Sequence, residues 1–211
     1  MSYKSFHSVD EAELWGRKYY KKIYELPPES DLDIAFQLYK GRLAMMLNNQ
    51  LRGCLSKRDK RELNLFITLD PTNEDKLRKR SDDVIREVSK NKVGENIITY
   101  RFTKYKYIKK IANQKINVGI SFSDKALLST TLVPKQLCGW AEDHGYNCML
   151  KIYVPSGTCG VYLPSRYDEN IDTNECEFLM PQNIKLKIIN IRNEGVWRSK
   201  LWFIDCVVSE N

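Results

Sequence analysis

The sequence ECEFLMP, residues 175–181, sets two carboxylates two positions apart at the head of an apolar run. If this run is a strand, alternation puts Glu175 and Glu177 on one face and Cys176 on the other. Two like charges on one face are costly unless a cation or hydroxyl groups lie beside them. Such a pair can hold a cationic group or stabilise positive charge in a transition state. The alternative is an ordinary charged strand edge.

Segments rich in β-branched and aromatic residues surround this run from about residue 96 onward. Their composition and length predict short strands. The predicted strands are 97–100, 118–122, 127–131, 148–154, 160–163, 184–191 and 201–208. The polar, turn-rich stretch 164–174 is predicted to be an exposed loop.

The first third of the chain carries helix signals instead. Residues 8–11 form a capping box, and apolar residues then recur at three- and four-residue steps until Pro27. Ser30 begins a second amphipathic helix. Because helices come first and strands follow, the order predicts an α+β fold with a mainly helical part, 1–92, and a strand-rich part, 93–211.

The length and composition of the chain predict one domain over residues 1–211. Lys and Arg number 34 and Asp and Glu 27, which gives a formal charge of +7. A basic chain favours acidic partners, such as nucleic acid, an anionic membrane or a phosphate-bearing cofactor, without choosing among them. No apolar run reaches the roughly 18 residues that span a bilayer, and no secretory signal is visible after Met1.

The sequence contains six cysteines and two histidines, and these numbers limit the metal and redox chemistry that it can support. No two cysteines form a CxxC pair, and His7 is far from His144 in sequence, so we expect no metal site. Scattered cysteines in a chain with enough core material usually stay reduced, and buried free thiols are expected. His144 is either a base or an ordinary surface histidine.

Several common nucleotide-binding and hydrolase motifs are absent: GxGxxG after a strand, GxxxxGK[ST] and GxSxG. Beside the glutamate pair there remain Arg101, at the end of a predicted strand, and Ser129-Thr130-Thr131 inside another. Arginine supplies a fork that fits phosphate. Hydroxyl groups in a strand can orient a neighbouring carboxylate.

This order of arginine, Ser-Thr-Thr and Glu-x-Glu resembles the bacterial mono-ADP-ribosyltransferase toxins of the Arg–Ser–Glu class. It resembles in particular the Rho-inactivating clostridial exoenzymes and the enzymatic components of binary actin-modifying toxins. The segments that carry the resemblance are 9–22, 47–53, 95–101, 128–132 and 175–181. The resemblance implies a mono-ADP-ribosyltransferase fold, in which N-terminal helices pack on two perpendicular antiparallel β-sheets that hold NAD in a cleft.

The resemblance also implies roles for individual residues. Glu177 would be the catalytic glutamate, bonded to the 2′-hydroxyl of the nicotinamide ribose, and Ser129 would position it. Glu175 would orient the acceptor, and a glutamate there goes with an arginine acceptor. Arg101 and Arg52 would hold NAD, chiefly its phosphates. Further cofactor contacts are implied for Asn48, Phe102, Ser129 and Thr130.

Some positions depart from the family pattern. Phe102 stands where the family usually has glycine after the NAD-binding arginine, and Thr131 is the third residue of a motif that usually reads Ser-Thr-Ser. Asp172 stands where an aromatic residue usually precedes Glu-x-Glu, and Tyr167 is the nearest aromatic. The candidates for the ring that stacks on nicotinamide are Trp140 and Tyr146.

We therefore predict an NAD-dependent, metal-free transferase that moves ADP-ribose to an arginine of a host protein and releases nicotinamide, with NAD glycohydrolase side activity. Actin enters as a target by resemblance only. We expect a monomeric toxin or effector that is secreted or delivered and acts in the host cytosol.

Two alternatives remain open. One is a catalytically silent member of the fold that acts as a binding module. The other is a basic nucleic-acid-binding protein, supported by the run 104–110, in which lysines alternate with aromatic residues. The same run also fits an amphipathic segment beside the cleft, with its lysine stems on apolar surface.

Overall fold

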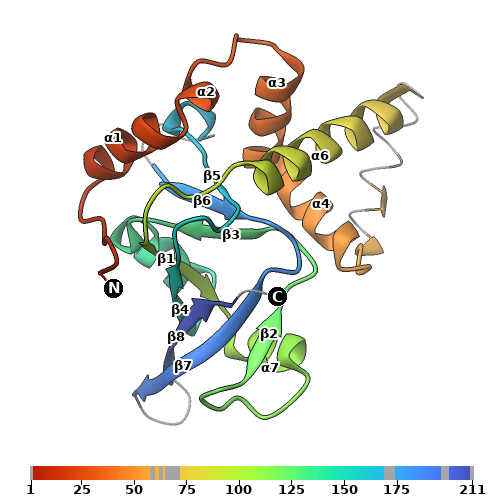
Figure 1. The fold of residues 1–211 in the computed structure, drawn as a ribbon. Coiled ribbons are helices and arrows are strands. Elements are labelled where there is room, and N and C mark those ends of the chain that lie inside the picture. The colour runs from red at the N-terminus through yellow and green to blue at the C-terminus, as the bar shows by residue number, and fades with distance from the viewer. Residues whose placement is uncertain are drawn as a thin grey trace.

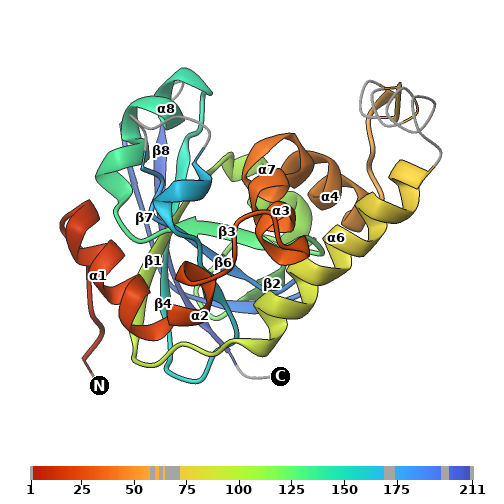
Figure 2. The same ribbon diagram turned by 90° about the horizontal axis from the view of Figure 1, so that it is seen from above.

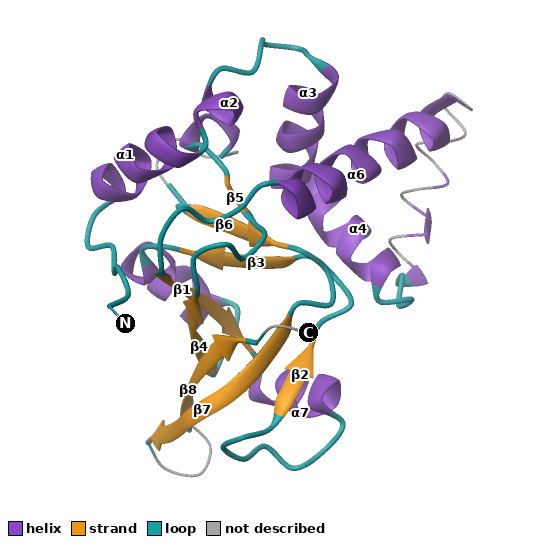
Figure 3. Cartoon of the chain, in the orientation of Figure 1, coloured by secondary structure: helices purple, strands orange, loops and turns teal. Residues whose placement is uncertain are grey.

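The structure, a computed structural model, describes residues 2–57, 60, 61, 64, 72–168, 174–195 and 200–209. Helices from the first part of the chain gather over one end of a sheet that the second part builds (Figure 1). Figure 3 shows the same separation by colour. The predicted α+β class is confirmed.

The serines predicted to begin the two N-terminal helices cap them in the structure. Ser8 caps α1 by accepting a hydrogen bond from the backbone N–H of Glu11, and Ser30 caps α3 in the same way through Asp33. The first helix breaks at Tyr20, so the stretch forms two helices. The helices are α1 (Val9–Tyr19), α2 (Lys21–Tyr24), α3 (Asp31–Leu38), η1 (Tyr39–Leu43), α4 (Ala44–Leu51), α6 (Thr72–Lys90), α7 (Tyr105–Ala112), η2 (Pro134–Leu137), α8 (Cys138–Asp143) and η3 (Ser165–Tyr167).

Within the described residues, eight strands form one hydrogen-bonded sheet in the order β2-β7-β8-β4-β1-β3-β6-β5. The strands are β1 (Ile97–Thr103), β2 (Ser121–Ser123), β3 (Leu128–Thr131), β4 (Cys148–Val154), β5 (Val161–Tyr162), β6 (Glu177–Met180), β7 (Lys185–Glu194) and β8 (Leu201–Val208). Neighbours are antiparallel except for β4 and β8, which are parallel. This parallel pair is the one departure from the implied antiparallel arrangement.

The sheet consists of two blocks that run across each other. In Figure 1, β3 and β6 lie across the direction of β1, β4, β8 and β7. β1 joins β3 through the register pair Tyr100 and Thr131. The expected perpendicular sheets are therefore two blocks of one continuous sheet, and the corner between them lies where β1 meets β3.

The stretch 164–174 is not the fully exposed loop that its polar composition predicts. It contains the short helix η3, in which Tyr167 is buried. The Tyr167 hydroxyl donates to Asp33 Oδ1 at 2.8 Å, and Arg166 pairs with the same oxygen at 3.0 Å. A buried carboxylate of α3 therefore draws this segment inward. Residues 169–173, Asp172 among them, lie outside the described residues.

The cysteines are all free, but they are not all buried as expected. Cys54, which follows α4, and Cys138, the first residue of α8, are exposed, and Cys159 is half-buried. The buried thiols are Cys148, Cys176 and Cys206.

Aromatic packing joins α1 to β5 and β6, which are the strands beside the glutamate pair. The Trp15 ring lies edge-on to Tyr162 and to Phe178, with ring centroids 6.2 Å apart in both pairs. Gly16 brings the helix backbone onto Tyr162, since an added Cβ would lie 2.3 Å from the ring atom Cδ1. Figure 2 shows α1 on one side of the molecule and α6 beside α3 on the other. The two groups of helices thus flank the short strands from both sides.

We predict that Gly16→Ala destabilises the fold, because its Cβ would overlap a fully buried ring. Overpacking of this kind costs about 1 to 3 kcal/mol. Gly139→Ala is the matched control: it is also helical, but an added Cβ meets nothing within 4 Å. Both changes gain about 1 kcal/mol of helix propensity. The measurement is the urea midpoint at unchanged m value. Equal stability of the two variants would contradict the packing of α1 on Tyr162.

Candidate active site

Only Glu177 of the glutamate pair lies in a strand. Glu175 and Cys176 form a turn that leads into it, whereas the alternation argument assumed a strand for both glutamates. β6 begins at Glu177, and Cys176 has φ +45°, a left-handed conformation that is uncommon for a residue other than glycine. The Thr131 hydroxyl donates to the Glu175 carbonyl at 2.8 Å, and the backbone N–H of Leu132 donates to the Cys176 carbonyl at 3.0 Å. The turn is thus held against β3, and it brings both carboxylates to one place.

Ser129 and Glu177 lie in hydrogen-bond contact across β3 and β6. Thr131 stands opposite Glu177 in the register, so Ser129 is the diagonal neighbour on the same face. The Ser129 hydroxyl donates to Glu177 Oε1. The Glu177 side chain is buried, with 7% of its surface exposed. A strand pairing therefore holds this carboxylate in one orientation.

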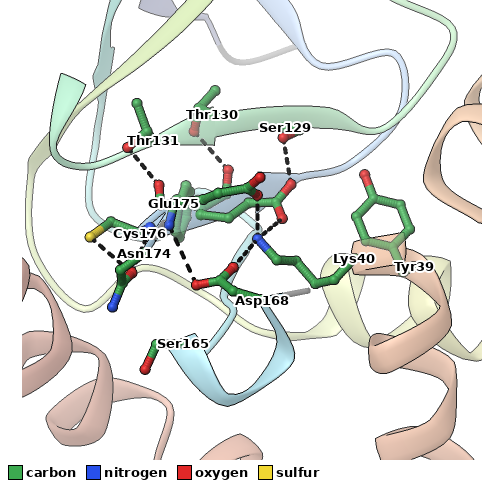
Figure 4. Close-up of polar contacts among 12 residues, drawn as sticks. Tyr39, Lys40, Ser129, Thr130, Thr131, Ser165, Asp168, Asn174, Glu175 and Cys176 are labelled. Carbon is green, nitrogen blue, oxygen red and sulfur yellow. Dashed lines mark hydrogen bonds and ion pairs between the residues drawn. The ribbon is translucent and has the colours of Figure 1, made fainter. Parts of the chain in front are cut away.

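A buried lysine that the sequence analysis did not single out meets the carboxylates (Figure 4). Lys40 Nζ lies 2.6 Å from Asp168 Oδ1 and 3.1 Å from Glu177 Oε2, and it also pairs with Glu175 Oε2. The Lys40 side chain is only 2% exposed. One ammonium and three carboxylates thus form a cluster drawn from three separate segments of the chain, around residues 40, 168 and 175–177.

The cluster shifts the pKa values of its members. Burial alone lowers the pKa of Lys40, but the charges of Glu177, Glu175 and Asp168 outweigh it, and the pKa is raised. Burial raises the pKa of Glu175 and of Asp168, and the nearby ammonium opposes that rise. The lysine therefore stays charged at neutral pH and offsets part of the repulsion among the carboxylates.

A cavity of about 190 Å³ opens beside this cluster, and most of the predicted site residues line it. Trp140 and Tyr146, the two stacking candidates, both reach it, with ring centroids 5.2 Å apart. The lining residues are Tyr100, Arg101, Phe102, Ser129, Thr130, Thr131, Leu137, Trp140, Tyr146, Glu175 and Glu177. The cavity is thus lined both by carboxylates and by aromatic rings.

A second cavity, of about 320 Å³, shares Arg101 and Tyr146 with the first. Its other lining residues are Arg52, Thr103, Lys104, Lys106 and Tyr107. Arg101 Nη1 donates to the Ser129 carbonyl at 2.9 Å, which ties β1 to β3 at the corner of the sheet. The two cavities together run from an acidic end at Glu177 to a basic end at Arg52.

Arg52 reaches the second cavity while bound to a partner. Its Nε and Nη2 donate to the two oxygens of Asp124 at 2.9 and 2.7 Å, and Tyr107 donates to the same carboxylate at 2.8 Å. Burial raises the pKa of Asp124, but the hydrogen bonds from Arg52, the Ala126 N–H and Tyr107 outweigh it and lower the pKa. Arg52 is thus held in a bidentate pair that the sequence did not predict.

Two predicted cofactor contacts are placed differently. Asn48 is not among the described residues that line either cavity, and its Nδ2 donates to the Tyr39 hydroxyl at 3.5 Å. Asn48 Oδ1 is buried without a hydrogen-bond partner among the described residues. Thr130 lines the first cavity, but its hydroxyl donates to the Phe178 carbonyl at 2.7 Å.

Two searches of the described residues for other features gave no candidate. No group of three or more His, Cys, Asp or Glu side chains there is arranged to hold a metal ion. In the same part of the chain, no helix has the length and apolar character needed to cross a bilayer.

The chain matches one known protein family. A family model described as ADP-ribosyltransferase exoenzyme matches residues 12–208, and the chain belongs to this family. The resemblance to bacterial mono-ADP-ribosyltransferase toxins is thereby confirmed. A search of curated protein sequences finds no match.

Solved structures share the fold at low sequence identity. The C3 exoenzyme of Clostridium limosum is 22% identical, with 100% of this chain and 98% of that chain covered and a TM-score of 0.70. C3stau2 from S. aureus, solved with NAD, is 16% identical, covered at 100% of both chains with a TM-score of 0.70. The toxin BECa of C. perfringens, solved with NADH, is 20% identical with a TM-score of 0.68, and 99% of this chain matches 50% of that one.

We predict that Asp124→Asn lowers the free energy of unfolding at pH 7 by about 1.5 to 3 kcal/mol, the usual range for hydrogen bonds to a charged group. Because the pKa of Asp124 is lowered on folding, its contribution is present above the unfolded pKa of about 3.9 and is lost as the pH falls through the folded pKa. Denaturation at several pH values should therefore show the two proteins converging in acid.

The matched control for this prediction is Asp31→Asn. Asp31 pairs with Lys79 at 2.6 Å, but both side chains are exposed, so its removal should leave stability nearly unchanged. A loss in Asp124→Asn that stays constant with pH would contradict the role of the Asp124 charge.

Proposed function

We propose that this chain is an NAD-dependent mono-ADP-ribosyltransferase that transfers ADP-ribose to an arginine of a host protein and releases nicotinamide. One observation carries the proposal: Glu177, held by Ser129, faces a cavity that continues past Arg101 into a basic cavity at Arg52. A carboxylate at one end and cations at the other match the charges of NAD during cleavage.

The reaction needs negative charge where the nicotinamide leaves. As the bond between nicotinamide nitrogen and ribose C1′ breaks, its electron pair leaves with nicotinamide and the sugar becomes an oxocarbenium-like cation. A fixed Glu177 carboxylate stabilises that cation more than the ground state. The acceptor nitrogen then bonds to C1′ and loses a proton.

The basic cavity fits the pyrophosphate of NAD. Arg101, Lys104 and Lys106 line it, and Arg52 keeps Nη1 outside its bidentate pair with Asp124. Cations there can hold the phosphates and leave the nicotinamide end beside Glu177. The NAD and NADH of two of the similar solved structures support this assignment.

Glu175 is suited to the acceptor. Its side chain is 46% exposed and lines the first cavity, so a guanidinium group can reach it. A carboxylate pairs with a guanidinium through charge-assisted hydrogen bonds. We therefore assign an arginine acceptor, with actin as one candidate target by family resemblance. From the family resemblance we also propose that residues 1–211 form one catalytic domain and that the protein acts as a monomer in the host cytosol.

Phe102 favours one alternative, a catalytically silent member of the fold. It lines the first cavity at the position where the family has glycine, and a ring there takes space close to the nicotinamide. NAD glycohydrolase activity of the native chain separates the two functions.

A nucleic-acid-binding function is less well supported by the placement of the run 104–110. Most of the run lies in α7, where Ile108 packs into the core while Lys104, Lys106 and Tyr107 line the second cavity. A steep loss of nucleic-acid affinity with added salt would revive it.

We predict that Glu177→Gln lowers both transfer and NAD hydrolysis at least about 100-fold, since groups that stabilise transition-state charge commonly have this effect. NAD affinity by titration should change little, because the phosphates are held elsewhere. Glu194→Gln, an exposed glutamate of β7, is the control. Wild-type turnover in Glu177→Gln would remove the proposed mechanism.

We predict that Glu175→Gln loses transfer to a small guanidine acceptor but keeps measurable NAD hydrolysis. The amide cannot pair with a guanidinium as a carboxylate does, whereas water needs no such partner. The two rates are measured on one preparation by nicotinamide release with and without acceptor. Unchanged transfer to the guanidine would contradict the acceptor assignment.

A further inference from the structure

Lys40 is a buried charged group to which the proposed chemistry assigns no role. It comes from η1, while the carboxylates around it come from the segment after η3, from the turn and from β6. Lys40 is not among the described residues that line either cavity. Lys40 therefore contacts the two glutamates without lining the space proposed for substrate.

We propose that Lys40 is a positioning residue that supplies the counter-charge for Glu175 and Glu177 and fixes both carboxylates toward the cavity. Asp168 anchors the ammonium from the opposite side. This inference rests on the proposed function, because it concerns the carboxylates assigned to catalysis and acceptor binding.

The geometry matches the hydrogen-bonding capacity of lysine. An ammonium group has three N–H donors, and Lys40 Nζ meets one oxygen from each of Asp168, Glu175 and Glu177. Glu177 uses its other oxygen to accept from Ser129. Both oxygens of Glu177 are thus held by partners, from β3 on one side and from η1 on the other.

The helix backbone is irregular next to Lys40. Residues Tyr39–Leu43 join α3 to α4 across a kink, at which Gly41 departs from helical geometry with φ −90° and ψ −139°. A sharp kink in a helix has a local cause, and here it directly follows Lys40. Here Tyr39 and Lys40, which are adjacent in sequence, both carry buried side chains.

The electrostatics explain why a cation is needed there. Three carboxylates this close cannot all stay ionised without a counter-charge, because each raises the pKa of the others. The remaining neighbours do not supply one: burial raises the pKa of Tyr39 and raises that of Cys176 to about 12, so both stay neutral. Arg101 also lies near this group, but it donates to the Ser129 carbonyl and lines the second cavity.

The test is the pH dependence of NAD hydrolysis by Lys40→Met and Asp168→Asn in the full chain. Loss of the ammonium removes the counter-charge that favours ionised carboxylates, so the acid limb of the activity profile should move to higher pH by about one pH unit or more. Loss of a carboxylate has the opposite sign, so Asp168→Asn should move the acid limb to lower pH. A general loss of stability in both variants could not move the acid limb to higher pH in Lys40→Met and to lower pH in Asp168→Asn.

The kinetic constants give a second readout. Lys40→Met should lower kcat roughly 10- to 100-fold, as expected when a reacting group is misplaced, and leave KM for NAD nearly unchanged. Lys40→Arg keeps the charge and should restore the position of the acid limb. The control is Lys79→Met, which removes an exposed lysine from its ion pair with Asp31. Its profile should match that of the native chain.

A carboxyl titration separates this proposal from the proposed function. Carbon-13 NMR of labelled glutamate follows ionisation without any turnover, so it decides the role of Lys40 even in a chain that does not cleave NAD. A wild-type acid limb and kcat in Lys40→Met would overturn the proposal, as would limbs that move the same way in Lys40→Met and Asp168→Asn. If Lys40→Met does not fold, Asp168→Asn and Lys40→Arg still test it.

Discussion

The register between β3 and β6 determines where Ser129 and Glu177 stand. Thr131 lies opposite Glu177, which brings Ser129 within reach of the same carboxylate. Two threonine hydroxyls of β3 hold the carbonyls of Glu175 and Phe178, so the partner segment cannot slide without losing both bonds. Because side chains alternate along a strand, a slip of one residue would turn Glu177 away from the cavity. The short strand pair thus serves chemistry as well as folding.

Charge is distributed along the cavities in the order that the proposed cleavage of NAD requires. Carboxylates stand at one end, cations at the other, and Arg101 lies between them. Each end contains its own internal partner: Lys40 beside the carboxylates and Asp124 beside Arg52. These partners hold the functional side chains in place before any ligand arrives, which is the basis of electrostatic preorganisation.

The sequence predicted the parts of the site that lie on regular elements. Strands 148–154 and 201–208 have the predicted limits, and Ser129 and Glu177 meet because strand pairing brings their segments together. Lys40 lies 135 residues from Glu175 and is a single lysine in a helical stretch, so no local pattern marks it. Asp168 belongs to a segment predicted to be an exposed loop, so the sequence did not place it beside the two glutamates. Three acidic residues predicted in one place would have indicated that a cation must lie among them.

The left-handed backbone at Cys176 links the interior of the protein to its reactive surface. This conformation is strained for a side chain other than glycine, and the thiol that accompanies it is buried in the hydrophobic core. The residues on either side of that thiol are the two cavity glutamates. A substitution at Cys176 would therefore change the placement of both carboxylates as well as the packing of the core.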